Sequence, residues 1–170
     1  MEWIGNGCRG VFQWYHLNHP LSDSNHIWGG KVITKMTTIQ PTYIDDRYPL
    51  SGMTGRIIAA AREVHGVLGP GFQEVVYQRA LALELPDHDL NCDREVWIDI
   101  QYKDRKVGRK RVDFLITDKE DGVMVEIKAK YALEEVDFVQ ALSYLKASGY
   151  KVGLLLNFGG KQLEIRRLAN

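Results

Sequence analysis

Three charged side chains stand in segments that are otherwise apolar. Asp113 lies within VDFLI, and Glu126 and Lys128 interrupt VMVEIKA. Ionised groups rarely have such neighbours unless they are paired or bind an ion. Because side chains alternate along a strand, Glu126 and Lys128 should share one face, and a short turn should bring Asp113 beside them.

Two adjacent carboxylates repel each other unless a cation lies between them. A hard divalent ion such as Mg²⁺ or Mn²⁺ suits Asp113 and Glu126, with a backbone carbonyl and water completing its oxygen ligands. Lys128 could then orient an attacking water or neutralise charge on a phosphoryl group. This is the chemistry of phosphodiester hydrolysis. The other interpretation is a surface ion pair, which an isolated Glu-x-Lys on a strand commonly forms.

A basic run precedes Asp113 in the sequence. The segment KDRKVGRKR, residues 103–111, holds six basic residues and one acidic residue. The period of two places Arg109 and Arg111 on the face of Asp113, so with Lys106 they could contact a nucleic-acid backbone without reading its sequence. The ordinary alternative is a solvated hairpin tip.

The elements that would position these residues can be read from the spacing of apolar positions. Helices are predicted over 54–68, 72–85 and 133–148, and strands over 94–102, 109–116, 123–129, 151–158 and 163–168. Thr54 is a plausible N-cap of the first helix, which Gly69 should end. An antiparallel meander followed by a helical crossover predicts an α/β fold with a mixed sheet flanked by helices.

Residues 51–170 are expected to form one domain. Residues 1–50 are rich in Gly, Asn, His, Trp and Thr and show no useful periodicity, so they read as a flexible or loosely packed N-terminal extension. Met36 is an alternative start of translation.

Composition excludes some classes of protein. The 22 basic and 22 acidic residues give no net charge, so any nucleic-acid surface must be a local patch. No run is long and apolar enough to cross a membrane. The two cysteines are too few for a disulfide framework, which favours a cytoplasmic location.

The motifs around the charged residues resemble a known family. Asp113 followed by Glu126-Ile127-Lys128, on a hairpin before a helix, resembles the PD-(D/E)XK nuclease superfamily. GPGFQEVVYQRAL matches the signature of the GxxExxY protein family, with Gly71, Glu74 and Tyr77 at the named positions. The resemblance covers about residues 52–170 and implies a restriction-endonuclease-like αβββαβ core. No proline precedes Asp113, where the superfamily's name would place one.

The resemblance also implies roles for individual residues. Asp113, Glu126 and the backbone of Ile127 would be metal ligands, Lys128 the catalytic lysine, and Glu74 an additional acidic ligand. The residues Gln140 and Tyr144 resemble the glutamine and tyrosine that follow this strand in RecB-like nucleases, and their spacing puts both on one helix face.

Each supporting residue has a structural alternative. Glu74 could be a favourable acid in the first turn of its helix. Tyr77 and His65 could be core residues with satisfied polar tips. Gln140 and Tyr144 could simply pack.

The leading prediction is a nuclease that depends on Mg²⁺ or Mn²⁺ and cleaves DNA rather than RNA. The alternative is a catalytically silent nucleic-acid-binding or partner-binding protein that retains the fold. Intact acids at 113 and 126 and an intact lysine at 128 argue against that alternative. The sequence specifies no oligomeric state, and a homodimer is compatible with it.

Overall fold

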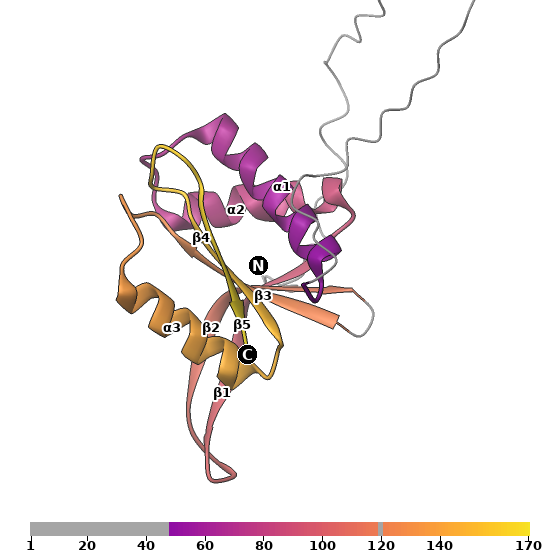
Figure 1. Ribbon diagram of the computed structural model, residues 1–170, viewed down its shortest axis with the longest axis vertical. Coiled ribbons are helices and arrows are strands. Elements are labelled where there is room, and N and C mark those ends of the chain that lie inside the picture. Colours follow the sequence, from indigo (N-terminus) through magenta and orange to yellow (C-terminus); the bar gives the residue numbers. More distant parts are fainter. Residues whose placement is uncertain (1–47, 119–120) are drawn as a thin grey trace, which may run out of the picture.

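The elements follow one another in the predicted order. The computed structural model describes residues 48–118 and 121–170. It begins with helices α1 (Ser51–Leu68) and α2 (Glu74–Glu84) and a 3₁₀ turn (Leu85–His88). The remaining elements are β1 (Asn91–Tyr102), β2 (Arg105–Asp118), β3 (Asp121–Lys128), α3 (Glu135–Ser148), β4 (Val152–Asn157) and β5 (Glu164–Ala169) (Figure 1). The predicted α/β order of two helices, three strands, a helix and two strands is confirmed.

The five strands form one mixed sheet in the order β1-β2-β3-β4-β5. β3 and β4 pair in parallel, and the other neighbours pair antiparallel. Parallel neighbours need a long connection, and α3 provides it. The predicted mixed sheet with a helical crossover is therefore confirmed.

Helices cover both faces of this sheet. On one face α1 and α2 pack on strand residues such as Phe114 and Leu154, and on the other α3 packs through Leu145 on Met124. β3 and β4 lie inside the sheet and are buried almost throughout. This two-sided burial explains why both strands read as nearly continuous apolar runs. It also puts any charged residue of β3 in a dry environment.

The predicted N-cap of α1 is wrong. The helix begins at Ser51, and Thr54 lies inside its first turn. The Thr54 hydroxyl contacts the carbonyl oxygens of Leu50 at 3.1 Å and Ser51 at 3.2 Å, and it accepts a hydrogen bond from Arg167 Nη1 at 2.8 Å. The hydroxyl therefore bonds within the first turn and to Arg167 of β5, and the N-cap position is taken by Leu50. Gly69 ends the helix as predicted.

Tyr77 closes the loop between α1 and α2. Its ring is fully buried and stacks on Phe158, with ring centroids 4.8 Å apart. Its hydroxyl donates to the Gly69 carbonyl oxygen at 2.8 Å and accepts from the Phe72 N–H at 3.2 Å. His65 contacts the Gly160 carbonyl oxygen through Nε2 at 3.1 Å. Both rings are thus placed as structural residues whose polar tips have partners.

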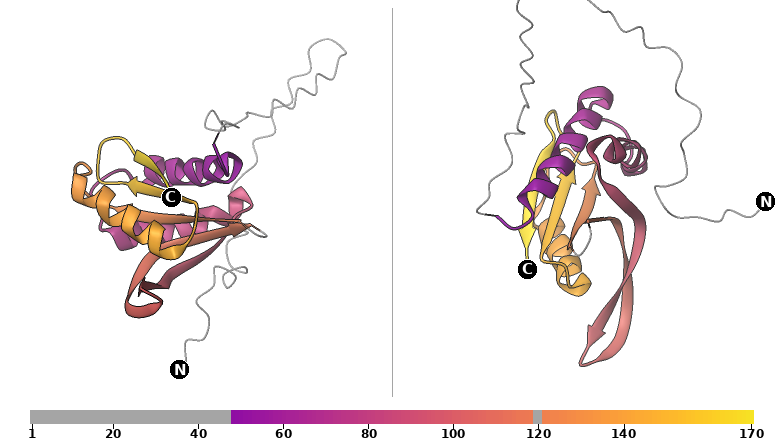
Figure 2. Two further views of the ribbon diagram at one scale, coloured as in Figure 1. Left: turned by 60° about the horizontal axis from the view of Figure 1, so that its bottom comes forward. Right: turned by 90° about the vertical axis from the view of Figure 1, so that its right-hand side faces the viewer.

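The β1–β2 hairpin is longer than predicted and extends beyond the rest of the fold (Figures 1 and 2). Its pairing runs from Asn91 opposite Thr117 to Tyr102 opposite Arg105. One face of the hairpin packs against α3 through partly or fully buried apolar residues: Val96, Ile98 and Val112. Polar positions alternate with these along both strands, so the other face carries charged and aromatic side chains.

The expected N-terminal extension and the alternative start at Met36 lie outside the described residues, apart from residues 48–50. Within the described part of the chain, no helix is long and apolar enough to span a membrane.

Candidate functional site

The acidic pair lies where β2 and β3 separate. Regular pairing runs from Asp118 opposite Asp121 to Phe114 opposite Val125, and the next position would set Asp113 against Glu126. There Asp113 Oδ2 accepts a hydrogen bond from the Ile127 N–H at 2.7 Å. Glu126 in turn takes a hydrogen bond from the Asp113 backbone. Each carboxylate therefore receives a backbone N–H of the opposite strand, and the two acids are held close together at the opening.

Glu126 is the most unusual residue of this pair. Glu126 is only 5 % exposed, and its Oε1 atom has no hydrogen-bond partner in the part of the chain that the structure describes. Burial raises the pKa of Glu126 to about 8, the charge of Asp113 acts in the same direction, and Lys128 opposes both. A buried carboxylate oxygen without a partner costs free energy that a donor or cation would offset. No ion pair joins Lys128 to either acid among the described residues, which disfavours the surface ion pair considered above.

Asp113 is oriented by two neutral donors. Besides the Ile127 N–H, the Gln78 amide of α2 donates to Oδ1 at 2.6 Å. Burial raises the pKa of Asp113, the Ile127 hydrogen bond opposes this, and the charge of Glu74 adds to it. Sequence reasoning missed Gln78. The available signal was its position four residues after Glu74, which puts both on one face of α2.

Two lysines approach the acids from the side of α3. Lys128 Nζ donates to Gln140 Oε1 at 3.3 Å. Lys110 lies 5.1 Å from the centroid of the Tyr144 ring, and a hydrogen bond with Tyr144 is the main cause of a raised pKa of Lys110, to which the charges of both acids also contribute. The structure thus brings Gln140 and Tyr144 to lysines beside the acidic pair. Lys110 was missed because the alternation argument assigned only its neighbours in the strand to the site.

The side chains at the site supply some, but not all, of the oxygen ligands that a hard cation needs. Glu74 is the first residue of α2, where its charge also suits the helix N-terminus. Among the described residues, no group of three or more His, Cys, Asp or Glu side chains is arranged to hold a metal ion. Two carboxylates with the remaining ligands from backbone and water are nevertheless an ordinary set for Mg²⁺. The unpartnered Oε1 of Glu126 is the observation that supports such an occupant.

The predicted phosphate-contacting residues lie on the β1–β2 hairpin. Lys106 pairs with Asp99 at 2.5 Å, and Arg111 pairs with Glu95 at 3.2 Å. The Arg109 guanidinium lies 4.3 Å from the centroid of the Trp97 ring. Exposed pairs of this kind contribute at most about 1 kcal/mol. All three side chains can therefore exchange these partners for phosphate at little cost.

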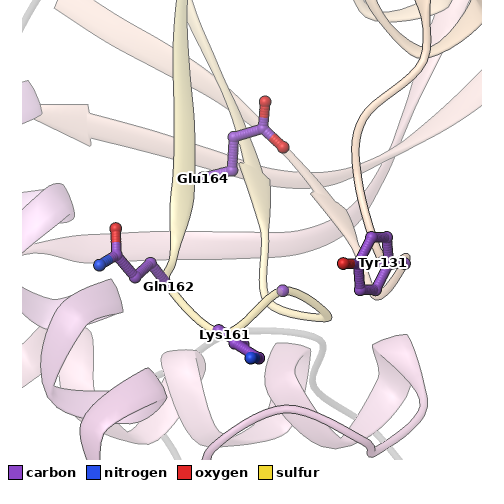
Figure 3. A pocket seen from close by; sticks show the side chains of 5 residues that line it. Tyr131, Lys161, Gln162 and Glu164 are labelled. Atoms are coloured by element: carbon purple, nitrogen blue, oxygen red, sulfur yellow. The ribbon is translucent and has the colours of Figure 1, made fainter.

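A separate open pocket lies between the loop after β3 and the loop joining β4 to β5. It is lined by Tyr131, Gly160, Lys161, Gln162 and Glu164. The labelled side chains spread around the space and do not converge on one point (Figure 3). The pocket contains neither acid of the pair, and we assign it no chemistry.

Comparison with known proteins identifies the family of the chain. The family model described as PD-(D/E)XK nuclease superfamily matches residues 51–168. No curated protein sequence matches the chain. The crystal structure of SSO0001 aligns with 74% of this chain at 14% identity and a TM-score of 0.44, and this chain spans 61% of that one. Because the family match covers more than half of the sequence, the chain belongs to the PD-(D/E)XK nuclease superfamily.

Proposed function

We propose that the protein is a metal-dependent nuclease that hydrolyses phosphodiester bonds in DNA. One observation carries the proposal: a buried carboxylate oxygen of Glu126, without a hydrogen-bond partner among residues 48–118 and 121–170, lies beside a second acid whose two oxygens are already oriented. Repulsion and burial disfavour two ionised acids at this position, so Glu126 keeps a proton unless a cation binds. The superfamily supports a nucleic-acid substrate. The resemblance of Gln140 and Tyr144 to residues of RecB-like nucleases supports DNA.

The cation ligands in this proposal are Asp113, Glu126 and the Ile127 carbonyl. Glu74 at the start of α2 remains a predicted ligand, and its charge already reaches Asp113. When bound there, Mg²⁺ or Mn²⁺ supplies a Lewis acid that polarises a phosphoryl oxygen.

The other side chains would position groups and balance charge. Gln78 holds the Asp113 carboxylate in one orientation. Gln140 holds the Lys128 ammonium, which can stabilise negative charge that grows on the phosphoryl group. Lys110, beside Tyr144, adds a second positive charge on the same side. These groups are preorganised, so they need little rearrangement when charge develops.

A cleavage assay tests the proposal directly. Linear, nicked, branched and single-stranded DNA, and RNA, are each incubated with Mg²⁺ or with EDTA. We expect cleavage that EDTA abolishes and that Asp113→Asn reduces by at least about a hundredfold. Mg²⁺ binding without cleavage of any substrate would instead indicate a silent nucleic-acid-binding protein. Absence of Mg²⁺ and Mn²⁺ binding by calorimetry would contradict the metal site itself.

Replacing Gln78 by alanine should weaken Mg²⁺ binding roughly ten- to a hundredfold, because it removes a hydrogen bond that orients a ligand. Calorimetric titration with Mg²⁺ measures this change. Gln73→Ala is the matched control, since Gln73 precedes α2 and is exposed. Equal Mg²⁺ affinity in wild type and Gln78→Ala would show that Asp113 needs no such orientation.

A further inference from the structure

Trp97 is an exposed aromatic residue in the middle of the β1–β2 hairpin. It is 54 % exposed, although a tryptophan that served only packing would be largely buried. Trp97 lies opposite Arg111 in the ladder. Directly opposed residues of antiparallel strands share a face, so Trp97 lies on the hairpin face of Arg109 and Arg111. The other face of the hairpin packs on α3.

This placement brings the indole close to the acidic pair. Arg111 precedes Asp113 by two residues, a separation of about 7 Å along the strand. The charge of Arg111 reaches Asp113, which agrees with that distance. A chain that runs along this hairpin face would therefore meet Trp97 immediately before it meets the acids.

The charge around Trp97 indicates a polyanionic partner. Residues 95–111 contain six basic and three acidic side chains, in a protein with no net charge. The Arg109 guanidinium lies 4.3 Å from the Trp97 ring centroid, and that of Arg111 lies 6.0 Å from it. A tryptophan among arginines fits a nucleotide, since the ring can stack on a base while the guanidinium groups contact phosphates.

We propose that Trp97 is a stacking platform for an unpaired base, so that the site takes single-stranded DNA or a single-stranded region of branched DNA. This inference rests on the proposed nuclease function and names its substrate class. A base paired inside a duplex has both of its faces covered by neighbouring bases, so it cannot stack on an exposed ring. Base stacking is also stronger than an exposed cation–π contact, so a base can displace Arg109 from the ring.

Binding of the full chain to a labelled oligonucleotide in EDTA tests the platform apart from catalysis. Fluorescence anisotropy should show that Trp97→Ala weakens binding of single-stranded DNA about tenfold or more, and that Trp97→Phe retains most of the affinity. Affinity for duplex DNA should change less than threefold. Tyr102→Ala is the matched control: Tyr102 is 62 % exposed on the same strand, but at its far end, five residues beyond Trp97 and away from the acidic pair. It should bind like wild type.

An oligonucleotide of abasic sugars distinguishes stacking from backbone contact. Wild type and Trp97→Ala should bind this oligonucleotide equally. Equal binding of normal single strands by the two proteins, or an equal loss on duplex and abasic DNA, would overturn the platform. A base-dependent role of Trp97 without cleavage of any substrate would leave the platform standing and contradict the nuclease. Cleavage of single strands that Trp97→Ala leaves unaffected would contradict the platform and leave the nuclease standing.

Discussion

Replacing Glu126 by glutamine should abolish Mg²⁺-dependent cleavage and, in EDTA, make the protein more stable than wild type at alkaline pH. Burial raises the pKa of Glu126 from an ordinary value of 4.5 to about 8. The folded state therefore holds this proton more tightly than the unfolded state does. The stability that this provides is fully present below about pH 4.5 and is lost as the pH rises through about 8, by roughly 5 kcal/mol in total.

Glutamine cannot ionise, so the variant lacks this loss. Urea unfolding of both proteins in EDTA, between about pH 4 and about pH 9, gives the two free energies of unfolding. As the pH rises across that range, the free energy of unfolding of Glu126→Gln should increase relative to that of wild type by several kcal/mol. Mg²⁺ should then stabilise wild type at the alkaline end and leave the variant unchanged. Glu63→Gln is the control, since Glu63 is exposed on α1. Parallel profiles for wild type and Glu126→Gln would show that burial does not perturb Glu126.

Much of the site could be predicted because its geometry is local. The strands predicted over 109–116 and 123–129 are separated by a short connection, and counting back from the pair Thr117–Gly122 sets Asp113 against Glu126. The polarity pattern after Lys128 likewise predicted a helix, and that helix carries Gln140 to the lysine. In both cases a short connection fixes which residues can meet.

Contacts between distant segments could not be predicted in the same way. Gln78 reaches Asp113 because α2 packs across the sheet, and its spacing from Glu74 indicates only a shared helix face, not the partner on β2. Lys110 points away from Arg109 and Arg111, yet its charge still reaches both acids from the side of α3. Thr54 has the residue type of an N-cap, but Arg167 engages it from β5.

The burial of Glu126 also could not be predicted from the sequence. An acid between apolar residues on a strand suits either an edge, where it is solvated, or a central strand, where it is not. The order of the strands decides this, and β3 lies in the centre between β2 and β4. Central placement therefore converts a common Glu-x-Lys triplet into a carboxylate with a strongly raised pKa.

Lys128→Ala should lower kcat for DNA cleavage by at least about a hundredfold and leave Mg²⁺ affinity within about threefold of wild type. The ammonium lies beside the acids without pairing with them, and Gln140 Oε1 holds it at 3.3 Å. It is therefore available to a phosphoryl group, and its role is charge stabilisation at that group. Lys128→Arg should recover part of the activity, since it keeps the charge but changes the geometry.

Lys130→Ala is the matched control for this lysine. Lys130 lies two residues further along and pairs with Glu134 at 2.6 Å and Asp137 at 2.9 Å, so its charge is already neutralised. Its loss should lower stability and leave kcat close to wild type. Single-turnover cleavage and calorimetric Mg²⁺ titration of all four proteins separate chemistry from binding. If Lys128→Ala cleaved DNA at the wild-type rate, lysine would have no part in the reaction. If it lost Mg²⁺ binding as well, the ammonium would act on the acidic pair and not on the phosphoryl group.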